Sequence, residues 1–141
     1  MKAERARLKR LQRLERVRAI AKQAAASEAA RAEGTLAQLD ALAQRSQRLA
    51  LDYANRNEAL DGAALQQLSR FAGGLQSISE STANDAERAR QFADTKLELL
   101  AAAERSRAAV ETRADKQAQS MAKREIAPAT GVRRGFGTGL E

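Results

Sequence analysis

The sequence predicts an all-α fold: a long two-helix antiparallel coiled-coil hairpin followed by a disordered C-terminal tail. The chain has 141 residues, and it is rich in Ala, Arg, Gln, Glu and Leu, which are strong helix formers. The single proline, Pro128, lies beyond the last expected helix. There are only four aromatic residues, and much of the apolar content is alanine, whose burial removes little apolar area. This composition favours a thin seam between two helices over a thick globular core.

The first helix is expected over about residues 2–58, because apolar residues recur there at alternating spacings of three and four, which places them on one face. The expected seam, meaning the row that faces the partner helix, consists of Leu39, Leu42, Ser46, Leu49, Tyr53, Arg56 and Leu60. A turn is expected at about 57–62, with Asp61 as an N-cap and Gly62 in a left-handed conformation. A connection this short predicts antiparallel neighbours.

The second helix is expected over about residues 63–126, completing a helical hairpin domain over 1–126, with the tail at 127–141. Its seam is predicted to contain Leu65, Leu68, Ala72, Leu75, Ser79, Thr82, Ala86, Ala89, Ala93, Lys96, Leu100, Ala103, Arg107, Val110 and Ala114. A flanking row with sevenfold spacing consists of Phe71, Ile78, Phe92 and Leu99, interrupted by Asp85. This row is most simply part of the core. With only two helices to cover it, part of the row could instead bind a partner.

The N-terminal stretch has a different apolar pattern. Apolar residues recur there at every third position, namely Leu8, Leu11, Leu14, Val17 and Ile20. Because a helix turns about 100° per residue, such a series moves around the helix by about 60° at each step. One partner helix therefore cannot bury all of them.

Charge is unevenly distributed along the chain. Residues 1–22 contain nine Lys or Arg against two acidic residues, a net charge of +7, whereas residues 23–112 have a net charge of −3. Residues 113–141 have a net charge of +3. A hairpin would bring the two basic ends together, and such a basic pole attracts acidic partners.

Catalysis and metal binding find little support in the sequence. The chain has no cysteine and no histidine, which removes thiol and imidazole chemistry and most transition-metal sites. Carboxylate pairs such as Glu111 with Asp115 would lie on one helix face, without the cleft that shifts the pKa values of catalytic acids. We therefore expect no enzyme, no cofactor and no catalytic or metal-binding residues. No apolar run is long enough to predict a membrane span, so a cytoplasmic protein is expected.

The basic N-terminus leaves three kinds of partner open: protein, nucleic acid and an anionic membrane surface. It lacks aromatic residues for base stacking, and it lacks helix-turn-helix spacing or a basic-zipper signature. It also lacks a clean apolar face for lipid. A protein partner is therefore favoured, and no nucleic-acid partner is expected.

The order of these features resembles the flagellar export protein FliJ and its type III secretion counterparts. The resemblance runs to about residue 117. It begins with the closely spaced leucines of Leu8–Leu14, continues with Tyr53 and Gly62, and then takes in the apolar series Leu65, Leu68, Phe71, Leu75 and Ile78. It ends with the charged stretch Ala103–Glu111.

The resemblance implies a hairpin similar to the central stalk subunit of rotary ATPases. Its paired ends would insert into the hexameric export ATPase, and its shaft would contact the export gate protein and substrate chaperones. The location implied is cytoplasmic, peripheral at the inner face of the cell membrane. Independently of the resemblance, two copies could bury the same seam as one folded copy, which leaves an intramolecular hairpin and a homodimer as alternatives. The residues assigned to the ATPase-facing end are Leu8, Arg10, Leu11, Arg13, Leu14 and Val17. The alternatives are a coiled-coil adaptor or structural protein that associates through its incomplete seams, and a basic helical nucleic-acid binder.

Overall fold

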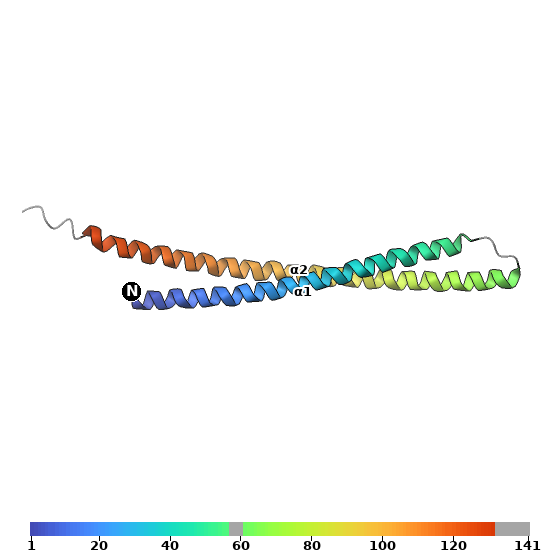
Figure 1. Cartoon of the computed structure of the whole chain (residues 1–141), viewed down its shortest axis with the longest axis horizontal. Coiled ribbons are helices and arrows are strands. Elements are labelled where there is room, and N and C mark those ends of the chain that lie inside the picture. The colour runs from blue at the N-terminus through green and yellow to red at the C-terminus, as the bar shows by residue number, and fades with distance from the viewer. Residues whose placement is uncertain (57–60, 132–141) are drawn as a thin grey trace, which may run out of the picture. The chain divides into compact units, whose positions relative to one another are not determined.

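Two long helices make up the fold. The structure, a computed structural model, describes the backbone of residues 1–56 and 61–131. Helix α1 spans Lys2–Ala54 and α2 spans Gly62–Gly131, and neither described stretch contains a strand (Figure 1). The predicted all-α hairpin of two packed helices is therefore confirmed.

The helix bounds differ from the expected ones at two places. Helix α1 ends at Ala54 and not near residue 58. Helix α2 continues to Gly131 and so passes Pro128. The φ of proline is compatible with a helix, and the hydrogen bond that Pro128 removes and the carbonyl four residues earlier that its ring crowds both lie near the end of α2. Of the predicted tail, residues 132–141 lie outside the described residues.

The start of α2 is capped as expected. The backbone N–H of Ala64 donates to Oδ1 of Asp61 at 2.6 Å, and the N–H of Leu65 donates to the carbonyl of Asp61 at 3.1 Å. Asp61 is therefore the N-cap of α2. The prediction that Gly62 adopts a left-handed conformation was wrong. No described glycine has a positive φ, and Gly62 is the first residue of α2. Most of the predicted turn, 57–60, lies outside the described residues.

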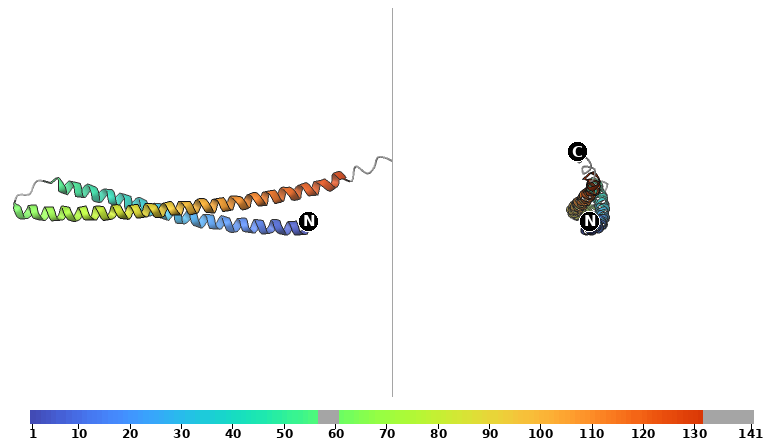
Figure 2. Two further views of the ribbon diagram at one scale, coloured as in Figure 1. Left: turned by 180° about the vertical axis from the view of Figure 1, so that it is seen from behind. Right: turned by 90° about the vertical axis from the view of Figure 1, so that its left-hand side faces the viewer.

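The chain divides into two compact units. The terminal unit joins Met1–Ala24 to Ala101–Glu141, of which the structure describes residues up to 131, and the middle unit is Ala25–Leu100. Within the terminal unit the blue end of α1 lies beside the orange-to-red end of α2 in both Figure 1 and Figure 2. Ion pairs join Glu4 to Arg124 and Lys22 to Glu104, so the two helices run antiparallel within this unit.

The helices are also antiparallel within the middle unit. Lys96 is paired with Glu28 at 3.0 Å and Arg90 with Asp40 at 3.4 Å. Nearer the turn, the rings of Tyr53 and Phe71 meet edge to face, with centroids 4.7 Å apart. Residue numbers therefore rise along α1 as they fall along α2.

The seam of α2 follows the predicted frame. From Leu68 onward its buried and half-buried residues include the predicted members through Ala114 and continue in the same spacing to Gln117 and Met121. Only Leu65, which is 55% exposed, falls outside it. Ala93, at 1% exposure, is the most buried of these residues.

The prediction of the residues that form the seam of α1 was half right. Leu39, Ser46 and Tyr53 lie in it as predicted, but Leu42 and Leu49 are 44% and 42% exposed. Each is replaced in the seam by the alanine that follows it, Ala43 and Ala50. Alanine allows two helices to approach closely, and a close approach leaves the neighbouring leucines at the edge of the contact. Of the other predicted members, Arg56 is exposed beyond the end of α1, and Leu60 lies outside the described residues.

Candidate protein-binding site in the terminal unit

The terminal unit concentrates the positive charge of the chain. Its described residues include fifteen Lys or Arg against six Asp or Glu, a net charge of +9, whereas the middle unit has a net charge of −3. The unit is formed by both ends of the chain, as the sequence predicted. A charge of this size on a narrow helix pair produces a field that attracts anionic or acidic surfaces.

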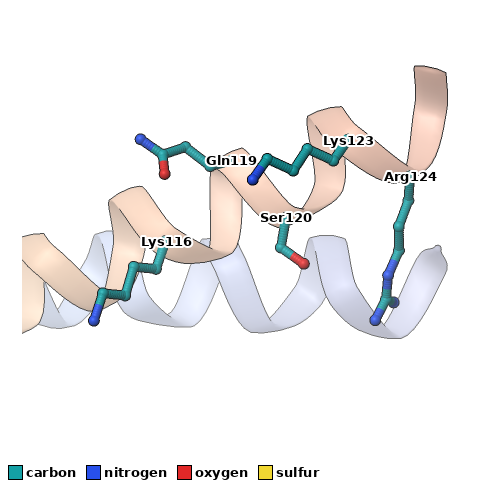
Figure 3. Close-up of a pocket in the computed structure, with 5 residues that line it drawn as sticks. All are labelled: Lys116, Gln119, Ser120, Lys123 and Arg124. Carbon is teal, nitrogen blue, oxygen red and sulfur yellow. The ribbon is translucent and has the colours of Figure 1, made fainter. Parts of the chain in front are cut away.

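Ion pairs hold the two helices of this unit together. Glu4 of α1 is paired with Arg124 of α2, and Arg5 lies 3.9 Å from Glu125. Figure 3 shows Arg124 reaching from α2 toward α1. These four side chains bring the first turn of α1 to the late part of α2. The cations Arg5 and Arg124 are thereby partly neutralised within the unit.

A larger charged cluster lies further along the seam. Arg107 donates to Glu104 at 2.9 and 2.8 Å and to Glu111 at 2.8 Å, and Lys22 of α1 lies 2.8 Å from Glu104. The hydrogen bonds from Arg107, and then the one from Lys22, lower the pKa of Glu104 to about 2. The same carboxylates raise the pKa of Arg107. The Glu104 carboxylate therefore stays ionised down to about pH 2, and its contact with Lys22 links the two helices.

The N-terminal apolar residues separate into two groups, as the threefold spacing predicted. Leu8 and Leu11 are half-buried, at seam spacing toward α2. Leu14, Val17 and Ile20 are 37%, 60% and 68% exposed. Leu8 and Leu11 therefore help to hold the hairpin together, and the outer apolar surface of this helix begins at Leu14.

The arginines assigned to the site lie on the outside of the unit. Arg10 and Arg13 are both exposed, and no ion pair involves either of them in the described part of the chain. Together with Ala3, Ala6 and Lys9 they line a shallow groove along α1. Arg10, Arg13, Leu14 and Val17 are thus available to a partner, and we call these four residues the outer face.

A second cationic hollow lies on α2 of the same unit. It is lined by Lys116, Gln119, Ser120, Lys123 and Arg124 (Figure 3). The sequence-based prediction included these cations only in the net charge of the C-terminal segment and did not identify them as a site. The sevenfold spacing of Lys116 and Lys123, which places both on one helix face, could have identified them.

Two further findings concern the described residues only. Neither α1 nor α2 contains a stretch apolar and long enough to cross a membrane. In residues 1–56 and 61–131, no group of three or more acidic side chains is placed to hold a metal ion. The carboxylates that do gather, Glu104 and Glu111, are held by Arg107.

Comparison with known proteins gives no relative. The chain matches no family model, no curated protein and no solved structure.

Proposed function

We propose that the chain is a non-enzymatic component of flagellar, type III protein export. In this role it couples the hexameric export ATPase to the export gate protein and escorts export substrates or their chaperones. It acts by binding, in the cytoplasm, peripherally at the inner face of the cell membrane. The observation that carries the proposal is the terminal unit, in which the two ends of one hairpin pair, carry a net charge of +9 and present the outer face.

The geometry of this unit supports the role in two ways. The ion pairs of Glu4 with Arg124 and of Lys22 with Glu104 hold both ends together, so the unit can enter a partner as one body. Its exposed apolar residues spread around part of α1, because Leu14, Val17 and Ile20 point in successive directions that span about 120° about the helix axis. A helix enclosed by a ring of subunits can use apolar and cationic side chains on several sides. The resemblance in the order of sequence features is the basis for proposing that this ring is the hexameric export ATPase.

The burial of the leucines decides which variant tests the proposal. Replacing Leu8 or Leu11 would disrupt the seam and unfold the terminal unit. The informative variant is Leu14→Asp with Val17→Asp, which changes only the outer face. The matched control is Leu51→Asp with Leu65→Asp, because both leucines are 55% exposed and lie in the middle unit.

The test is a pull-down from a lysate of the source organism, read by mass spectrometry. The native chain and the control should recover the hexameric export ATPase, and the outer-face variant should recover at least about tenfold less, since loss of central contacts typically exceeds 1.4 kcal/mol. Equal recovery by the outer-face variant would contradict the assignment of that face. Recovery of nucleic acid, or of no secretion component by any form, would overturn the export proposal.

A further inference from the structure

An apolar strip is exposed on the middle unit. It consists of the flanking row of α2, in which Phe71, Ile78, Phe92 and Leu99 are 52%, 53%, 56% and 52% exposed, with Leu42 and Leu49 of α1. The favoured interpretation of the row as core was therefore wrong for the isolated hairpin. The two helices contact each other closely along the alanine-rich seam, so the flanking row lies at the edge of that contact.

These six residues share one edge of the helix pair. Each directly precedes a seam residue, as Phe92 precedes Ala93 and Leu42 precedes Ala43. The two helices meet along that edge, because one hollow is lined by Phe92 of α2 and by Thr35 and Glu28 of α1, which also directly precede seam residues. The strip is thus a single surface to which both helices contribute.

The size of the strip suits self-association. A large apolar side chain presents about 150–200 Å², so six half-exposed ones present roughly 500 Å² per chain. Two such strips facing each other would bury about 1,000 Å² in total, which is near the lower limit for a specific interface. Three apolar positions per heptad is also the pattern of helices in a bundle, where more than one neighbour must be covered.

The order of residues along α2 indicates which partner fits. The sevenfold row reads Phe71, Ile78, Asp85, Phe92, Leu99, with two apolar residues on each side of one carboxylate. The pattern is the same in both directions. A second copy related by a two-fold axis at Asp85 would therefore place Phe71 near Leu99 of the other copy and Ile78 near Phe92, so that the four apolar residues of the row each face an apolar residue.

The charges at the centre of the row are self-complementary as well. Asp85 lies 3.9 Å from Arg88, and the side chains are 50% and 81% exposed. A two-fold axis at this point brings the two Asp85 carboxylates together, and the Arg88 of each copy, one helical turn away, can pair with the carboxylate of the other. A polar pair at the centre of an apolar interface also penalises shifted pairings, which would bury it against apolar residues.

We propose that two copies of the chain associate through this strip to form an antiparallel four-helix bundle, with the two-fold axis at Asp85. This interaction is independent of the export function proposed above, because it uses residues of the middle unit and none of the outer face. Binding of the ATPase and self-association can therefore fail separately.

The first test is sedimentation equilibrium of the full chain. The native protein should be a dimer at tens of micromolar, and Ile78→Asp with Phe92→Asp should raise its dissociation constant at least about tenfold. The control Leu51→Asp with Leu65→Asp should remain dimeric. Helicity is followed by circular dichroism, to show that each variant is folded. A native chain that stays monomeric, or a folded strip variant that dimerises like the native chain, would overturn the proposal.

The second test needs no substitution within the apolar residues. The chain has no cysteine, so Asp85→Cys introduces a single thiol. A short bis-maleimide should link two copies of this variant efficiently. It should link Gln44→Cys poorly, because Gln44 is exposed and lines a hollow on the other edge of the pair, with Gln47 and Gln76. Equal linking at the two positions would contradict an axis at Asp85.

Discussion

Three glycines in the middle of the helices provide a quantitative test of the fold. Gly34 lies inside α1, and Gly73 and Gly74 lie inside α2. None has a positive φ, and a Cβ added at any of them meets nothing within 4 Å. All three are exposed. The backbone there is therefore ordinary helix that alanine can adopt without strain.

The size of the effect follows from helix propensity. Glycine is less favourable than alanine in a helix interior by about 0.8–1.0 kcal/mol. The triple variant Gly34→Ala, Gly73→Ala and Gly74→Ala should therefore raise the free energy of unfolding by about 2.5 kcal/mol. The converse substitution, Ala41→Gly at another exposed position of α1, should lower it by about 1 kcal/mol.

Urea denaturation followed by circular dichroism measures these changes. Native and variant proteins are compared at one fixed protein concentration, because self-association would make stability concentration-dependent. A triple variant no more stable than the native chain, with Ala41→Gly behaving as expected, would refute the reasoning. It would mean that at least one of these glycines adopts a conformation or a contact that alanine cannot share.

Three further predictions concern the seam, the charged cluster and the cap. Ala93→Leu, at the most buried seam position, should destabilise the fold by about 1–3 kcal/mol in urea denaturation, whereas the exposed Gln91→Leu should not. Because the folded-state pKa of Glu104 is lowered to about 2, the stabilisation it provides is complete above about pH 4.5 and is lost as the pH falls toward 2. Glu104→Gln should therefore flatten the decline of the urea midpoint in that window, and an unchanged slope would contradict the ion-pair geometry. Asp61→Ala should cost about 0.5–2 kcal/mol in thermal unfolding, and Asp61→Asn should restore most of it.

The sequence was sufficient to predict the fold class and the seam of α2. Along α2 one frame of alternating three- and four-residue steps fits from Leu68 to Ala114, although its members Ser79, Thr82, Lys96 and Arg107 are polar. In α1 the pattern is ambiguous, because Leu42 and Ala43 are adjacent apolar candidates, as are Leu49 and Ala50. Hydrophobicity favours the leucines, whereas close approach of the helices favours the alanines. That choice depends on the facing helix and cannot be read from α1 alone.

The candidate site was predictable in its charge but not in its geometry. The distribution of charged residues along the sequence places the basic segments at the two ends, and hairpin topology pairs them. Which N-terminal leucines face the partner helix depends on the register set by contacts such as Lys22 with Glu104. The same holds for Phe71 and Phe92, whose spacing permits either core or surface and whose exposure is decided by how closely the helices approach.

The export proposal is tested most directly by deleting the gene for this chain in the source organism. The proposal predicts that the deletion strain loses swimming motility and secretes little flagellin, with a normal nucleoid. The native chain should restore both, and the variant Leu14→Asp with Val17→Asp should not, although it accumulates to the same level. A deletion strain that swims and secretes flagellin like its parent would contradict the proposed function.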